Sequence, residues 1–127
     1  MKRVVSIQDI SCLGKCSLTV ALPIISAMGV ETCVVPTAVL STHTGGFKDF
    51  TFHDLTQEIT PIADHWQKEG IHFDAIYTGY LGSFEQIELV GKFFDRFGGE
   101  GTLVYADPAM ADNGVLYTGF TPEFALE

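Results

Sequence analysis

The stretch AIYTGYLGSFEQIELVGKFFDRF, residues 75–97, joins a strand pattern to a helix pattern and decides the fold class. Residues 75–78 are typical of a short strand. Residues 83–97 predict a helix, with Ser83 as a candidate N-cap and with Glu85 and Glu88 in its first turns, where acids favour the helix dipole. Residues 102–106 predict a further buried strand. A strand, a helix and a second strand in this order predict a parallel sheet with right-handed crossovers.

The same alternation extends towards both ends of the chain. The predicted strands are residues 3–8, 32–36 and, at an edge, 50–53. The predicted helices are residues 16–28 and 54–69, the second with Ile59, Ile62, Ala63 and Trp66 on one face. Residues 41–49 predict a loop, and Thr121-Pro122-Glu123 has the form of a helix start. Pro23 predicts a kink or a later start in the first helix. No linker or repeat interrupts residues 1–127, so we expect one α/β domain that is unfinished within them.

Composition limits the classes of partner. The net charge is −9, which argues against a general nucleic-acid or anionic-membrane surface because both partners are negative. The most apolar stretch, residues 20–36, contains a proline, a glycine and a glutamate, so we expect no transmembrane helix. Cys12, Cys16 and Cys33 are odd in number and are interpreted as small buried side chains. These features predict a cytoplasmic protein.

Small, polar and acidic residues gather at the predicted carboxyl ends of the strands. This set comprises Asp9 and Gly14, then Thr37 and His43-Thr44-Gly45, then Thr78-Gly79-Tyr80, and finally Asp107-Pro108 and Asp112-Asn113-Gly114. Ligands of open α/β sheets bind beyond these ends, so the pattern predicts a binding edge.

Each member of this set has a structural alternative. Asp107-Pro108 suits a turn and a functional carboxylate equally well, and Asp112-Asn113-Gly114 favours a turn. The two carboxylates are also spaced to hold Mg²⁺ directly or through water. Tyr80 suits a core position, but its place at a strand end favours stacking on a flat ligand.

Four segments in this order resemble pyridoxal kinases of the ribokinase-like superfamily. They are Val5-Ser6-Ile7-Gln8 with Gly14, then Ser41-Thr42-His43-Thr44-Gly45, then Thr78-Gly79-Tyr80-Leu81-Gly82-Ser83, and finally Ala106-Asp107-Pro108-Ala109-Met110-Ala111-Asp112. The resemblance covers the whole chain. It implies the N-terminal half of a ribokinase-like three-layer sandwich and, in the complete enzyme, ATP-dependent phosphorylation of the 5′-hydroxymethyl group of a vitamin B6 vitamer.

The resemblance also implies roles for single residues. Asp9, His43, Thr44 and Tyr80 would line the substrate pocket, with Tyr80 packed against the ring. Asp9 departs from the serine that is common in the family, which affects the ring contacts. Asp107 and Asp112 would lie near the ATP phosphates and Mg²⁺. The family further implies a homodimer.

Two family motifs are not found in these residues. One is the Gly-x-Gly-Asp motif that supplies the catalytic base, and the other is an Asn-x-x-Glu segment that helps to place Mg²⁺. Both lie further along the family's chain. We therefore expect no catalytic base among residues 1–127 and little or no turnover by them alone.

Three alternatives stay open. Within the superfamily, Asp9 keeps hydroxymethylpyrimidine kinase possible as the activity. From another class, the chain is long enough for a complete non-catalytic α/β module, although it lacks the acidic pair and the lysine of a phospho-receiver and the phosphate loop of a flavodoxin. The third alternative is an inactive fragment.

Overall fold

The structure is a computed structural model that describes residues 1–127. Its elements in chain order are β1 (Arg3–Ser11), α1 (Leu18–Ala27), β2 (Glu31–Leu40), β3 (Phe52–Asp54), α2 (Thr56–Lys68), β4 (Ala75–Thr78), α3 (Phe84–Phe97), β5 (Leu103–Ala106), β6 (Ala111–Asp112), β7 (Val115–Leu116) and α4 (Pro122–Ala125). None of the helices has the length and apolar character needed to cross a membrane.

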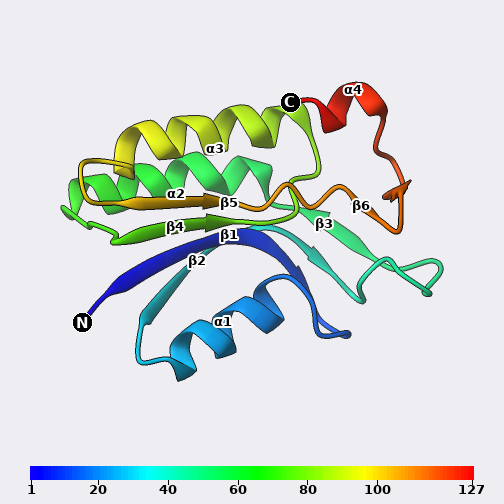
Figure 1. Ribbon diagram of the computed structural model, residues 1–127, viewed down its shortest axis with the longest axis horizontal. Helices are drawn as coiled ribbons and strands as arrows, with labels where there is room; N and C mark the ends of the chain where they lie inside the picture. Colours follow the sequence, from blue (N-terminus) through cyan, green and yellow to red (C-terminus); the bar gives the residue numbers. More distant parts are fainter.

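The main sheet has five strands in the order β3-β2-β1-β4-β5. Four of them run parallel, and only β3 pairs antiparallel, at the edge beside β2. Helices α2 and α3 cover one side of this sheet and α1 lies on the other, while β6 and β7 form a separate hairpin (Figure 1). These three layers confirm the predicted α/β sandwich with a mainly parallel sheet.

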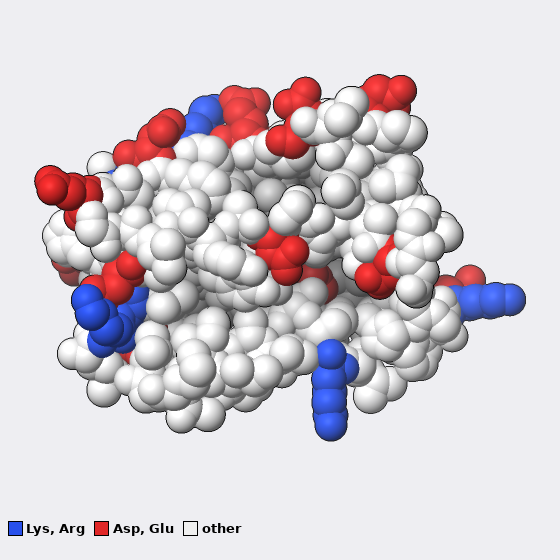
Figure 2. All heavy atoms as spheres, in the orientation of Figure 1, with Lys and Arg blue, Asp and Glu red and all other residues white.

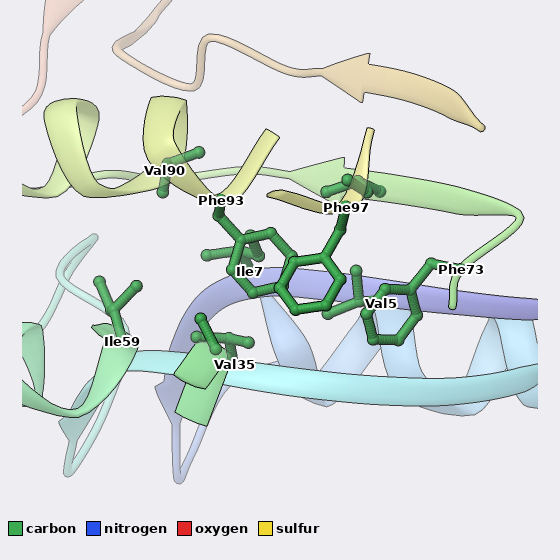
Figure 3. Packing of buried hydrophobic residues seen from close by; sticks show 10 residues of the cluster. Val5, Ile7, Val35, Ile59, Phe73, Val90, Phe93 and Phe97 are labelled. Carbon is green, nitrogen blue, oxygen red and sulfur yellow. The ribbon is translucent and has the colours of Figure 1, made fainter. Parts of the chain in front are cut away.

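The core lies between the sheet and the pair α2 and α3 (Figure 3). The strands contribute alternate apolar side chains, and α3 contributes two phenylalanines whose ring centroids are 4.5 Å apart, Phe93 and Phe97. Ten buried residues form the cluster: Val5, Ile7, Val35, Ile59, Ala63, Phe73, Ile76, Val90, Phe93 and Phe97. Burial of this apolar surface is the main force that holds α2 and α3 on the sheet.

Both covering helices match their sequence patterns. Ser83 is the N-cap of α3, because its Oγ accepts a hydrogen bond of 3.1 Å from the backbone N–H of Gln86. Helix α2 buries Ile59 and Ala63 on the face that the sequence predicts. Helix α1 begins at Leu18, two residues after the predicted start, and keeps Pro23 within it.

The first two strands are longer than predicted. β1 reaches Ser11 and β2 reaches Leu40, because their ladder continues past Pro36, which pairs with Gln8. The register shifts once between Gln8 and Ile10, so that two residues of β2 lie opposite Asp9. This β-bulge places Asp9 within the strand, at an irregularity of the kind that often adjoins active sites.

The prediction of a buried strand at residues 102–106 is wrong in its burial. β5 forms at Leu103–Ala106, but all four of its residues are exposed, because β4 is its only neighbour and β5 forms the open edge of the sheet. The predicted burial of the cysteines is also wrong for Cys12, which is exposed; Cys16 and Cys33 are half-buried.

Candidate functional site

Asp9 and Tyr80 lie beside each other at the carboxyl ends of two neighbouring parallel strands. Ile7 of β1 pairs with Thr78 of β4, and the chain carries Asp9 and Tyr80 two residues further along each strand. Asp9 is 5% exposed, and its Oδ2 accepts a hydrogen bond of 3.2 Å from the Ser11 hydroxyl. The structure therefore brings a buried carboxylate next to an aromatic ring, as the strand-end pattern predicts.

Tyr80 is half-buried and takes part in an aromatic stack. Its ring lies 5.3 Å from the ring of Phe120, centroid to centroid, at an interplanar angle of 12°. Burial, followed by the negative charge of Asp9, raises the pKa of the Tyr80 phenol. The phenol is thus held neutral and able to donate a hydrogen bond.

Gly79, the residue before Tyr80, allows a close approach of β4 to β1. A Cβ atom at this position would lie 2.7 Å from the side chain of Gln8, which is buried and donates to the Ser6 hydroxyl at 3.0 Å. Glycine is therefore needed at position 79 to keep the start of the loop that carries Tyr80 against β1.

His43 and Thr44 lie in the loop between β2 and β3, as predicted. The backbone N–H of His43 donates to the carbonyl of Leu13 at 3.0 Å, which joins this loop to the β1–α1 loop. The imidazole lies directly over Gly14, whose φ is +94°, and leaves no room there for a Cβ atom. Thr44 is exposed, whereas the neighbouring Thr42 has a buried hydroxyl without a hydrogen-bond partner.

Asp107 and Asp112 both lie near the hydroxyl of Tyr117. Partial burial, with the negative charges of Asp112 and Asp107, raises the pKa of that phenol. Asp112 begins the turn of the β6–β7 hairpin, in which Asn113 and Gly114 have positive φ, so the predicted turn is confirmed.

The two carboxylates do not form part of a larger ligand cluster. No group of three or more His, Cys, Asp or Glu side chains is arranged to hold a metal ion. Asp107 and Asp112 are exposed, so any cation there would keep part of its coordination for water or for other oxygen ligands.

Sequence reasoning missed three residues that shape this site. Gln86 is buried on α3, and its amide nitrogen donates to the Thr37 carbonyl at 3.2 Å and to the Thr56 hydroxyl at 2.9 Å. Its Oε1 accepts from the backbone of Gly82 at 2.8 Å, which fixes the turn after Tyr80. Phe120 and Tyr117, which lie against Tyr80, are the other two. The only sequence signal for Gln86 is a polar residue on the apolar face of a predicted helix.

The candidate site is separate from a surface hollow at the other end of the sheet. That hollow lies near the loops that precede β4 and β5, and is lined by Phe73, Asp74, Phe97 and Thr102 among others. In the view of Figure 2, acidic side chains are spread along the upper edge and the middle of the face, whereas basic side chains are few.

Comparisons with known proteins give the fold a family context. No protein-family model and no curated protein matches the chain. The chain is similar to a protein from Bacteroides thetaiotaomicron, provisionally named a phosphomethylpyrimidine kinase, in a crystal form with pyridoxal. The two are 48% identical with a TM-score of 0.92, and the match covers 97% of this chain and 43% of that one.

Two pyridoxal kinases show the same partial coverage. The enzyme from Lactobacillus plantarum is 29% identical with a TM-score of 0.85, and the match covers 98% of this chain and 44% of that one. The enzyme from Leishmania donovani, in complex with ADP and pyridoxamine, is 24% identical with a TM-score of 0.78 over 92% of this chain and 43% of that one, which supports the fold alone. The chain thus spans less than half the length of these proteins, and it has the fold of the N-terminal half of a ribokinase-like kinase.

Proposed function

We propose that this chain is the substrate-binding, N-terminal portion of an ATP-dependent kinase that phosphorylates the 5′-hydroxymethyl group of pyridoxal, pyridoxine or pyridoxamine. The observation that carries the proposal is the pair Asp9 and Tyr80 at neighbouring strand ends. The pair belongs to a chain that is 48% identical in sequence to a protein crystallised in a form with pyridoxal.

The substrate side of the reaction is assigned to the ends of β1, β2 and β4. One face of the Tyr80 ring is stacked on Phe120, so a flat heterocycle would use the opposite face, with Asp9 as a hydrogen-bond acceptor beside it. His43 and Thr44 are assigned to the same region because a hydrogen bond joins their loop to the loop that follows β1. These groups hold the substrate so that its hydroxymethyl group points towards ATP, and orientation of this kind is a large part of catalysis in phosphoryl transfer.

The nucleotide side is assigned to the segment after β5. Asp107 and Asp112 are two carboxylates near one hydroxyl, a donor set that suits Mg²⁺, which is commonly bound by one or two carboxylates together with substrate phosphates. When bound, Mg²⁺ would neutralise the phosphate charge that develops during transfer. Asp107 and Asp112 would hold that ion beyond the end of β5, at the carboxyl edge of the sheet.

The proposal assigns the rest of the active site to sequence beyond this segment. The relatives are more than twice as long as the part that this chain matches, and β5 leaves an open parallel edge on which a sheet can continue. We propose that residues 1–127 form part of one ribokinase-like domain, that the catalytic base lies in the remainder, and that the complete enzyme is a cytoplasmic homodimer.

A second candidate is hydroxymethylpyrimidine kinase. The provisional name of the Bacteroides thetaiotaomicron relative, phosphomethylpyrimidine kinase, favours a substituted pyrimidine as substrate. Asp9 in place of the serine that is common in pyridoxal kinases favours a substrate other than a vitamer. Both candidate substrates are flat nitrogen heterocycles with a primary alcohol, so the same pocket suits either.

The test is the intact mass of the protein from its source, followed by ADP release with each vitamer and with hydroxymethylpyrimidine. We expect a mass about twice that of the 13.9 kDa chain, and ADP release that depends on a vitamer. ADP release with hydroxymethylpyrimidine but with none of the vitamers would favour the second candidate, hydroxymethylpyrimidine kinase. A mass of 13.9 kDa with full activity would contradict the assignment of the base to a missing part.

A further inference from the structure

Asp9 is a buried carboxylate that the protein does not neutralise. Its side chain is 5% exposed, and none of the ion pairs of the protein includes it. Its one side-chain hydrogen bond comes from the neutral hydroxyl of Ser11, which in turn lies 3.4 Å from the sulfur of Cys16. A buried charge is costly unless a charge of opposite sign or several donors compensate it.

The surroundings of Asp9 indicate where a positively charged ligand group would lie. The β-bulge interrupts the register of the β1–β2 ladder at this residue. On the β4 side, Tyr80 is close enough for the charge of Asp9 to act on its phenol. Phe120 is stacked on one face of Tyr80, so a flat ligand ring would stack on the other face, and an edge of that ring turned towards β1 would meet Asp9. The ring edge of a nitrogen heterocycle carries a basic nitrogen, which becomes a charged N–H donor on protonation.

We propose that Asp9 is the specificity-determining charge partner of the substrate, and that its carboxylate accepts a hydrogen bond from a protonated nitrogen of a flat heterocycle at Tyr80. The inference rests on the proposed function for the location of the pocket and names its substrate class more narrowly: heterocycles that bind as cations. A charge-assisted hydrogen bond in a site shielded from water is stronger than a neutral one.

The experiment compares two ligands on the protein as its source produces it. One is pyridoxine, and the other is its benzene isostere, in which C–H replaces the ring nitrogen. Dissociation constants from calorimetry are measured for the wild type, for Asp9→Asn and for the control Asp95→Asn, which changes an exposed carboxylate on α3. Asparagine keeps the size of the side chain and an acceptor for Ser11 while it removes the charge.

We expect the wild type and Asp95→Asn to bind pyridoxine about tenfold or more tightly than the isostere. In Asp9→Asn the affinity for pyridoxine falls by a similar factor, and the affinity for the isostere changes by less than about twofold. A merely structural role of Asp9 would lower both affinities together, so equal losses overturn the inference. Equal affinity of the wild type for the two ligands, or no binding of pyridoxine at all, overturns it as well.

Failure of the proposed function looks different. Selective binding of pyridoxine through Asp9 without any ADP release would leave the inference intact and remove the kinase proposal. Phosphorylation of pyridoxine at an undiminished kcat/KM in Asp9→Asn would support the kinase proposal and overturn the inference about Asp9.

Discussion

The two sides of the sheet differ in how completely they are covered. On one side α2 and α3 pack on the strands and enclose ten buried residues, and the rings of Phe73, Phe93 and Phe97 contact one another in the middle (Figure 3). On the other side α1 packs only on β1 and β2. Tyr77 and Tyr105, which neighbour each other at the β4–β5 end, have no helix over them, and Tyr105 is 60% exposed.

This difference indicates which parts of the sheet have their apolar side chains covered within this chain. Exposed apolar side chains are ordinary when they are scattered, but three consecutive ones lie on β5. Leu103 and Tyr105 face the side of α1, and Val104, which pairs with Ile76, faces the side of α2 and α3. Helix α1 has the same character, because residues 16–30 carry no charged side chain and Leu22, Ile24 and Met28 are exposed. The covered side has a packed core over β1, β2 and β4, whereas the other side and the β5 edge expose apolar side chains that we propose the rest of a longer protein covers.

The largest expected effect tests the covered side. Phe93 is 1% exposed at the centre of the core, so Phe93→Ala should lower the free energy of unfolding by about 3–5 kcal/mol through lost burial and a cavity. Phe52→Ala removes the same group from a side chain that is 52% exposed on β3, and should cost less than about 1 kcal/mol. Urea unfolding measures both. Similar losses in the two variants would contradict the contrast between core and edge.

The open side gives the second test. Leu103 is 64% exposed in this chain. In the proposed longer protein, we expect the remaining part of the domain to cover it. In that protein Leu103→Ala should cost about 2–4 kcal/mol of unfolding free energy, as for a core leucine. Phe52→Ala, on the opposite edge strand β3, serves again as the surface change. A cost below about 0.5 kcal/mol for Leu103→Ala would mean that β5 stays uncovered.

Gln86 joins the covered side to the candidate site, and its loss should have an intermediate effect. Gln86→Ala leaves the Gly82 N–H without its partner and removes one of the two hydrogen bonds to the Thr37 carbonyl, which keeps the bond from the Leu55 N–H, so we expect a loss of about 1–3 kcal/mol. Gln57→Ala on α2 removes a glutamine with one exposed hydrogen bond and should change stability by less than about 0.5 kcal/mol. Thermal unfolding measures the pair, and equal midpoints would contradict the bridging role.

The contact between Gly14 and His43 gives a test in which the expected change in unfolding free energy is similar or smaller. Gly14→Ala and Gly29→Ala both place a side chain at positive φ, but only the first meets the imidazole of His43. Both variants should lose about 1 kcal/mol to backbone strain, and Gly14→Ala should lose more because the histidine must move. Ligand affinity should fall only in Gly14→Ala. Equal affinities would mean that His43 does not line the pocket.

The smallest effect concerns pH. Hydrogen bonds from the hydroxyl and the backbone N–H of Thr56 lower the pKa of Asp54 below its ordinary value of 3.8. Because the folded-state pKa is the lower one, this stabilisation is complete well above pH 3.8 and is lost as the pH falls below it towards the folded-state value. Asp54→Asn should show a shallower decline of the urea midpoint between pH 5 and 3. An unchanged decline would contradict this role of Asp54.

Features that depend on a few neighbouring residues could be predicted from the sequence. The N-cap Ser83, the face of α2 and the turn at Asn113-Gly114 were predicted correctly because each depends on local geometry. The meeting of Asp9 and Tyr80 follows from a topological rule, that parallel strands end at one edge.

Features that depend on distant pairing could not be predicted. Strand β2 was expected to end at Pro36, but its pairing with β1 carries it on to Leu40. The exposure of β5 depends on which strands and helices lie beside it, which the pattern of residues 102–106 does not contain. The stacking of Phe120 on Tyr80 joins residues forty positions apart, and no periodicity indicates it.

The open edge of β5 also affects the order of events during synthesis. If the proposed longer protein is made, its N-terminal half leaves the ribosome first, and a further stretch of at least this length takes roughly 6–25 s at about 5–20 residues per second. Throughout that interval the unpaired backbone of β5 and its apolar side chains are available to any other nascent strand. The yield of folded protein should therefore depend on chaperones that bind this edge, and slow codons after residue 127 should lower it.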